Sequence, residues 1–329
     1  MRMELSNTDL QPTVAEMFNA QKSMEGVILK TPLVPLNIDW PYAKIYLKLE
    51  NLHPVGSFKI RNAFCSFKNL PPNTKSVYTV STGNFARAVA WFGRRNNIKC
   101  TILVPDHAPK CKTDAVEKLG ADIVRIEHKE WFEIIAGRKV YEKGENLGVY
   151  LHPEFDRNVL AGNGTVALEI LQELPDVNTI IIPYGGGALS SGMGTAVKVL
   201  KPDVNIYTSE VDTSPQVYEC QKAGKAVPCK YTPNFCDGIG GRGCMLPVWK
   251  VARKVIDDTI VVSTRDIADA IKLLVESNYV ITEGAGASSV AAAMAAKGKL
   301  SGNVVCVVTG GNIDNKKLLQ VLRGEIPTD

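Results

Sequence analysis

The sequence predicts an α/β fold with a parallel sheet whose two faces are both covered by helices. Short, apolar, β-branched runs alternate with helix-like stretches along almost the whole chain, and this alternation is typical of parallel sheets. The 329 residues are too many for one small core. They favour two modest domains or one large domain with an insertion.

The expected elements fall into two series separated near Pro153. The first series predicts strands at residues 44–48, 76–80, 100–104, 123–126 and 149–151, and helices at about 84–95, 112–119 and 131–143. The second predicts helices at about 159–174, at 190–200 and after the cap residue Ser263, and strands at 179–182, 205–208, 259–262 and 304–308. Residues 227–247, rich in Gly, Pro and Cys, are expected to form a long loop, and loops of this length are often functional.

Composition excludes several classes of protein. The net charge of +4 comes from 38 basic and 34 acidic residues that are scattered, so it indicates solubility and not nucleic-acid binding. No apolar run approaches the roughly 20 residues of a membrane span, and the polar residues 1–19 do not look like a signal peptide. The eight cysteines contain no Cys-x-x-Cys. We therefore expect a cytoplasmic protein with reduced thiols and without a zinc site or disulfides.

The first candidate for chemistry is Lys59, in Gly-Ser-Phe-Lys at residues 56–59. Phe58, Ile60 and Phe64 are apolar neighbours in the sequence. In apolar surroundings an ammonium loses solvation, so its pKa falls and the neutral amine can form a Schiff base. Taken alone, a lysine beside a phenylalanine is more often a solvated surface residue.

Two further segments lie where a strand is followed by a helix. The first segment offers hydroxyls and free N–H groups at a helix start, which suits a carboxylate, and consists of Ser81, Thr82, Gly83 and Asn84. Helix capping alone would also explain these residues. The second segment is a glycine turn that would let the backbone approach a phosphate, and it consists of Gly185, Gly186, Gly187, Ala188 and Leu189. A dinucleotide site is the rival interpretation, with Glu210 as its ribose-binding acid, but its fingerprint needs glycine where the chain has Ser190. The third interpretation of the glycine segment is a tight turn that binds no ligand.

Thr309 begins Thr-Gly-Gly-Asn at residues 309–312, directly after the last expected strand. Its hydroxyl could exchange one hydrogen bond with a heterocyclic nitrogen. By itself the segment is only a turn.

Taken together, these segments resemble the fold type II pyridoxal-phosphate enzymes (tryptophan synthase β-like), specifically the threonine/serine dehydratase and serine racemase group. The resemblance covers nearly the whole chain, and six motifs occur in the family's order. They are Gly-Ser-Phe-Lys at 56–59, Ser-Thr-Gly-Asn at 81–84, the triple glycine at 185–187, Asp237-Gly238, Glu-Gly-Ala at 283–285 and Thr-Gly-Gly-Asn at 309–312. The family's fold has two open, twisted, mostly parallel sheets covered by helices, and the resemblance places a small domain at 76–152 inside a large domain of 1–75 and 153–329.

The resemblance also implies a role for each matching residue. Lys59 corresponds to the Schiff-base lysine of pyridoxal 5′-phosphate, and Thr82 to the residue that acts as the opposite-face base in racemases. The implied cofactor-binding residues are Phe58, Asn84, Gly185, Gly186, Gly187, Ala188, Leu189, Gly238, Glu283 and Thr309. The implied substrate-binding residues are Ser81, Thr82, Gly83, Asn84 and Asp237.

Departures from the family pattern bear on specificity. The family commonly has histidine where this chain has Phe85, so the carboxylate pocket is more apolar. Racemases have serine where this chain has Thr82, which keeps the hydroxyl but adds a methyl group. The racemase metal site is matched by Glu210 but not by Gln216, which stands in place of an acid, so we predict no metal.

The implied reaction is loss of the β-hydroxyl of a 3-hydroxy amino acid such as threonine or serine, which gives a 2-oxo acid and ammonia. A neutral Thr309 beside the ring nitrogen favours expulsion of a β-leaving group over transamination. Serine racemisation, dehydration of another 3-hydroxy amino acid and inert cofactor binding are the alternatives. By family analogy we expect a homodimer, an amino-acid substrate, no nucleic-acid or membrane partner, and no C-terminal regulatory domain.

Overall fold

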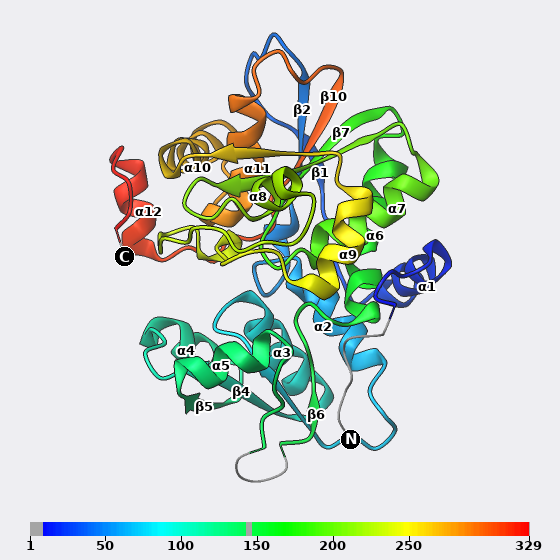
Figure 1. The fold of residues 1–329 in the computed structure, drawn as a ribbon, viewed down its shortest axis with the longest axis vertical. Coiled ribbons are helices and arrows are strands. Elements are labelled where there is room, and N and C mark those ends of the chain that lie inside the picture. The colour runs from blue at the N-terminus through cyan, green and yellow to red at the C-terminus, as the bar shows by residue number, and fades with distance from the viewer. Residues whose placement is uncertain (1–8, 143–146, 329) are drawn as a thin grey trace.

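The computed structural model describes residues 9–142 and 147–328 and contains two sheets (Figure 1). The larger sheet has the order β1-β2-β10-β7-β8-β9, and all neighbours are parallel except β1 and β2. Its strands are Leu33–Pro35, Lys44–Lys48, Asn303–Val307, Val177–Pro183, Asn205–Val211 and Asp258–Val262 in that order. The prediction of mostly parallel sheets is confirmed.

The smaller sheet has the order β5-β4-β3-β6 and is parallel throughout. Its strands are Asp122–Ile126, Lys99–Pro105, Ser76–Val80 and Val149–Tyr150. All four come from one continuous part of the chain, whereas the larger sheet uses residues from both sides of it. Figure 1 shows the two sheets in separate layers, with the smaller one below.

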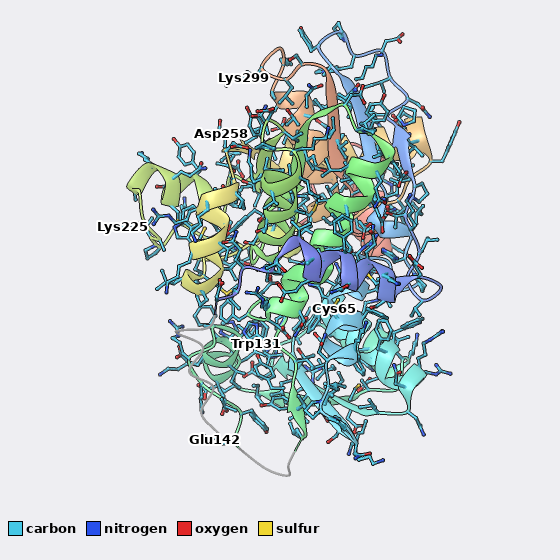
Figure 2. The ribbon with its side chains drawn as sticks, turned by 90° about the vertical axis from the view of Figure 1, so that its right-hand side faces the viewer. Cys65, Trp131, Glu142, Lys225, Asp258 and Lys299 are labelled. Carbon is cyan, nitrogen blue, oxygen red and sulfur yellow. The ribbon has the colours of Figure 1, made fainter. Side chains whose placement is uncertain are left out.

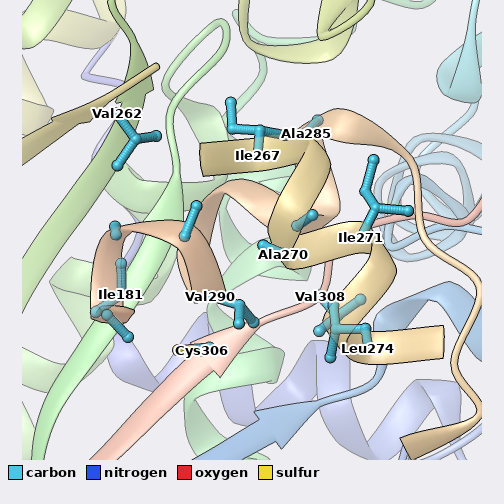
Figure 3. Packing of buried hydrophobic residues seen from close by; sticks show 14 of the residues in the cluster. Ile181, Val262, Ile267, Ala270, Ile271, Leu274, Ala285, Val290, Cys306 and Val308 are labelled. Carbon is cyan, nitrogen blue, oxygen red and sulfur yellow. The ribbon is translucent and has the colours of Figure 1, made fainter. Parts of the chain in front are cut away.

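Helices cover both faces of the larger sheet because alternate side chains of its strands point to opposite faces. Ile181 of β7 and Cys306 of β10 pack against α10 (Thr264–Asn278) and α11 (Gly284–Ala295), as Figure 3 shows. Ile180 of β7 belongs to a second buried cluster on the other face. The helices of that second cluster are α1 (Val14–Met24), α6 (Arg157–Glu173), α7 (Ala188–Leu200), α8 (Gln216–Ala223) and α9 (Leu246–Val255).

The smaller sheet is also covered on both faces. One buried cluster includes side chains from α2 (Lys59–Lys68), α3 (Asn84–Asn96) and α4 (Lys110–Glu117), and another includes Ile134 of α5 (His128–Ile135). Helix α2 also packs against α6 of the larger layer. Figure 2 shows Cys65 of α2 at the level where the two layers meet. The last α-helix along the chain, α12, spans Asn315–Leu322, and a short 3-10 helix at Glu50–Leu52 follows β2.

Most expected elements are confirmed within a few residues, but one helix is wrong. The helix expected at 131–143 ends at Ile135, because Gly137 takes a φ of 69° and closes the last turn, and residue 143 lies outside the described residues. The cap at Ser263 is confirmed as a capping box with Asp266. Residues 227–247 form mainly a loop, interrupted by the short helix Asp237–Ile239. Within the described part of the chain, no helix is long and apolar enough to cross a membrane.

Candidate active site

The candidate residues converge at the carboxyl ends of the parallel strands, where α/β folds commonly bind ligands. Lys59 begins α2, and residues 81–84 link β3 to α3. Residues 185–187 link β7 to α7, Glu283 precedes α11, and Thr309 follows β10. Three of these segments therefore follow the carboxyl ends of strands. Backbone hydrogen bonds of 3.0 Å bring the other two to the end of β10, because Phe58 donates to the carbonyl of Thr309 and Glu283 donates to that of Gly310.

Lys59 lies between two aromatic rings and a carboxylate. Its Nζ lies 5.1 Å from the centroid of the Phe58 ring and 5.9 Å from that of Phe85. It also donates a hydrogen bond of 2.7 Å to Oε1 of Glu154. The side chains of both ion-pair partners are mostly buried. Of the three apolar neighbours expected from the sequence, Phe58 lies beside the amine. Phe85 and Glu154 were not expected there, and Glu154 lies 95 residues away in the chain.

A buried charge network anchors helix α2, which carries Lys59. Arg61 donates two hydrogen bonds of 2.8 Å to Glu50 and two, of 2.6 and 2.9 Å, to Glu169. Glu169 also pairs with Lys48 of β2 at 2.7 Å. Burial would raise the pKa of Glu50, but the charges of Arg61 and His53 outweigh it and hold that pKa well below its usual value. The network therefore joins the first turn of α2, through Arg61, to α6 through Glu169 and to β2 through Lys48.

The glycine turn has the backbone shape of an anion site. Gly187 has a φ of 89°, which favours glycine. A Cβ on Gly185 would lie 2.4 Å from the carbonyl oxygen of Gly238, so these two backbones are in contact. The N–H of Ala188, at the start of α7, donates to Oε2 of Glu154 at 3.2 Å. The turn therefore already accepts a carboxylate, as the positive end of a helix should.

Asn84 and Glu283 join the two layers beside the turn. Nδ2 of Asn84 donates to Oε1 of Glu283 at 2.7 Å, and Nδ2 of Asn312 donates to Oδ1 of Asn84 at 2.7 Å. Burial, followed by the charge of Asp237, raises the pKa of Glu283 to about 7 against the opposing hydrogen bond from Asn84. Glu283 is therefore poised to change its protonation near neutrality.

The remaining candidates lie on or beside the segments already described. Asp237 pairs with Lys112 of α4, which connects the two layers on the exposed side. The N–H of Gly83 donates to Oγ of Ser81 at 3.3 Å, and Thr82 is partly exposed beside it. Thr309 is buried, and its carbonyl accepts the N–H of Phe58 at 3.0 Å. Sequence reasoning assigned no role to Lys112, and no pattern in the sequence links it with Asp237.

His152 fixes the position of Glu154. Its Nδ1 accepts the N–H groups of Glu154 at 3.0 Å and Phe155 at 2.8 Å, so Nε2 must donate to the carbonyl of Ile135 at 3.1 Å. Burial lowers the pKa of His152 to about 3, which keeps the ring neutral in this arrangement. The ring also stacks on Phe155, with centroids 4.1 Å apart.

Glu210 and Gln216, the partial match to a metal site, have protein partners. The Glu210 carboxylate accepts the N–H groups of Val217 at 2.7 Å and Tyr218 at 3.0 Å, and burial raises its pKa to about 7. Nε2 of Gln216 donates to the carbonyl of Gly185 at 3.3 Å. Residues 9–142 and 147–328 contain no group of three side chains arranged to hold a metal ion.

Comparison with known proteins identifies the family of the chain. Residues 24–310 match the family model described as pyridoxal-phosphate dependent enzyme. The chain is 34% identical to an L-threonine ammonia-lyase of Thermotoga maritima, over 92% of this chain and 76% of the relative. It is 35% identical to a serine racemase of Oryza sativa subsp. indica, over 90% of this chain and 89% of the relative.

Solved structures agree with the sequence relatives. Maize serine racemase superposes with a TM-score of 0.81 at 29% identity, covering 95% of this chain and 97% of that chain. The processed form of threonine deaminase isoform 2 from Solanum lycopersicum gives 0.82 at 28% identity, covering 95% and 90%. The chain belongs to the family of pyridoxal-phosphate dependent enzymes.

Proposed function

We propose that this enzyme eliminates the β-hydroxyl of a 3-hydroxy amino acid such as threonine or serine and releases a 2-oxo acid and ammonia. The observation that carries the proposal is the position of Lys59, whose amine lies beside an anion-accepting glycine turn. The amine and the turn bind the two oxygens of one carboxylate, and an amine beside an anion site suits an aldehyde cofactor that carries a phosphate. Relatives named L-threonine ammonia-lyase support this reaction.

The residues of the site fit pyridoxal phosphate. The turn that now accepts the Glu154 carboxylate would hold the cofactor phosphate on backbone N–H groups. Lys59 would form the covalent link, and when bound the cofactor would stabilise negative charge that develops at the substrate α-carbon. The residues proposed to surround it are Phe58, Asn84, Gly185, Gly186, Gly187, Ala188, Leu189, Gly238, Glu283 and Thr309.

The substrate would be oriented by the loop at residues 81–84. Hydroxyl and backbone N–H groups at the start of α3 would hold its carboxylate, and Asp237, an exposed residue paired with Lys112, would lie on the solvent side of the substrate. Lys59, freed from its covalent link, would remove the proton from the α-carbon. Acid–base assistance of this kind is worth about 10²–10⁴ in rate.

Serine racemisation is the second candidate, and Thr82 is the residue that favours it. Its side chain is partly exposed on the loop beside Ser81, and its hydroxyl would return the proton to the face of the α-carbon opposite Lys59. Relatives named serine racemase support this candidate.

A panel of 3-hydroxy amino acids, assayed for 2-oxo acid and for inverted substrate, separates the two reactions. We expect 2-oxo acid formation to dominate with threonine or serine. Lys59→Ala should abolish it, whereas Lys68→Ala on the exposed side of the same helix should not. Turnover by Lys59→Ala at the wild-type rate would refute the assignment, and inversion much faster than 2-oxo acid formation would favour the racemase.

The domain boundaries and assembly remain proposals. A small domain at 76–152 inside a large domain of 1–75 and 153–329 is supported by the strands of the smaller sheet, which all lie within it. We also propose a cytoplasmic homodimer by analogy with the family. Light scattering on the purified enzyme tests the dimer.

A further inference from the structure

Glu154 occupies the place where the proposed function puts an anion. One carboxylate oxygen accepts from the Lys59 ammonium at 2.7 Å, and the other accepts from the Ala188 N–H at 3.2 Å. The carboxylate also covers the turn, because a Cβ on Gly186 would lie 2.5 Å from Cδ of Glu154. Both groups that a phosphate-bearing aldehyde needs, the amine and the helix start, are therefore engaged by one side chain of the protein itself.

The position of Glu154 is built into the fold. His152 accepts the backbone N–H of Glu154 and donates to Ile135 of α5, so the segment is held from the smaller layer. The carboxylate meanwhile reaches the start of α7 in the larger layer. The side chain of Glu154 is only 12% exposed, and its two charge-assisted hydrogen bonds are of the stronger kind.

We propose that Glu154 is an internal competitor for the anion site, and that its carboxylate must leave Lys59 and Ala188 before the cofactor phosphate can bind. This inference deepens the proposed function and assigns to Glu154 control of cofactor affinity. The carboxylate and the phosphate carry the same sign of charge and need the same N–H groups. A ligand that binds only when a competing group has left has its apparent affinity reduced by the fraction of molecules in which that group is away.

The expected size of the effect follows from that fraction. If the carboxylate is away in about one molecule in ten, cofactor and free phosphate both bind about tenfold more weakly than to a site without the competing charge. Glu154→Gln keeps the size of the side chain and removes the charge. Glu154→Ala should bind both ligands about tenfold more tightly than the wild type. Glu154→Gln should bind with intermediate affinity, because its amide oxygen can still accept from the same N–H groups.

The test uses the full-length chain freed of cofactor. Dissociation constants are measured for inorganic phosphate by calorimetry and for pyridoxal phosphate by its absorbance change, in the wild type, Glu154→Gln and Glu154→Ala. Glu173→Gln is the matched control, since Glu173 is another partly buried carboxylate paired with lysine and is not part of the site. Circular dichroism confirms that each variant is folded, and Glu154→Ala replaces Glu154→Gln if the latter is not.

The inference predicts tighter binding of both ligands in the Glu154 variants and unchanged binding in Glu173→Gln. Equal or weaker binding in the Glu154 variants overturns it, even if the wild type binds pyridoxal phosphate on Lys59 and the proposed function stands. If phosphate binding follows the predicted order while pyridoxal phosphate never links to Lys59, the inference holds and the proposed function fails. Absence of phosphate binding in every variant also overturns the inference.

Discussion

Glu283 offers a direct test of the electrostatics of the site through the pH dependence of stability. Burial raises its pKa from 4.5 to about 7 in the folded protein. Between these values the folded protein holds a proton that the unfolded chain has released, so the free energy of unfolding falls as pH rises. Below pH 4.5 Glu283 is protonated in both the folded and the unfolded state, so its contribution to the free energy of unfolding no longer changes with pH. Glu283→Gln carries no titrating proton and should lack this component.

The magnitude follows from the size of the pKa change. At about 1.4 kcal/mol per pH unit, the change corresponds to an upper limit of about 3 kcal/mol. The side chain is partly exposed, and solvent screening should reduce the effect to about 1–2 kcal/mol. The hydrogen bond from Asn84 does not remove the difference between the variants, since the amide oxygen of Gln can accept it as well.

The assay is urea unfolding of cofactor-free protein at pH 5 and pH 8. We expect the wild type to lose about 1–2 kcal/mol more than Glu283→Gln between these values. Glu276→Gln, at an exposed position on α10, controls for loss of an ordinary surface carboxylate. Identical pH dependence in the wild type and Glu283→Gln would refute the reasoning.

Three further predictions concern the scaffold. Arg61→Met leaves the buried carboxylates of Glu50 and Glu169 without their shared partner. Urea unfolding should show that the free energy of unfolding falls by about 3–5 kcal/mol. A fall below about 1 kcal/mol would contradict the role of the network. Gly187→Ala places a side chain on a residue with a φ of 89°. This strain should weaken cofactor binding, as measured by absorbance titration. An unchanged dissociation constant would show that the turn does not need glycine at this position. Burial raises the pKa of Cys65 to about 12. Its thiol should therefore react with a disulfide reagent only after urea is added. Rapid reaction in the folded protein would show that the thiol is accessible to solvent, which contradicts this prediction.

The sequence predicted the sheet layers well because buried parallel strands are short apolar runs with clear ends. Residues 76–80, for example, form β3 with the predicted bounds. Helices were harder to predict where their pattern is weak. Helix α11 is rich in Ala, Ser and Gly and is buried almost throughout, so it lacks the polar face that marks an amphipathic helix. The helix expected at 131–143 was too long because a single glycine outweighed the helix-like residues beyond it.

The site was predictable where its groups are contained in local motifs. The turn at 185–187 and the loop at 81–84 each combine glycine or hydroxyl residues with a following helix, and that signal is readable in the sequence. Glu154 and Lys112 could not be found in this way. Each acts through a partner more than 90 residues distant in the chain, and only the packing of the two layers brings the pairs together.

The most direct test of the central claim is chemical labelling of Lys59. Purified enzyme supplemented with pyridoxal phosphate is treated with borohydride, digested and mapped by mass spectrometry. We expect one stable phosphopyridoxyl group, on the peptide that contains Lys59. Label on another lysine, or no label on protein that has been exposed to the cofactor, would contradict it.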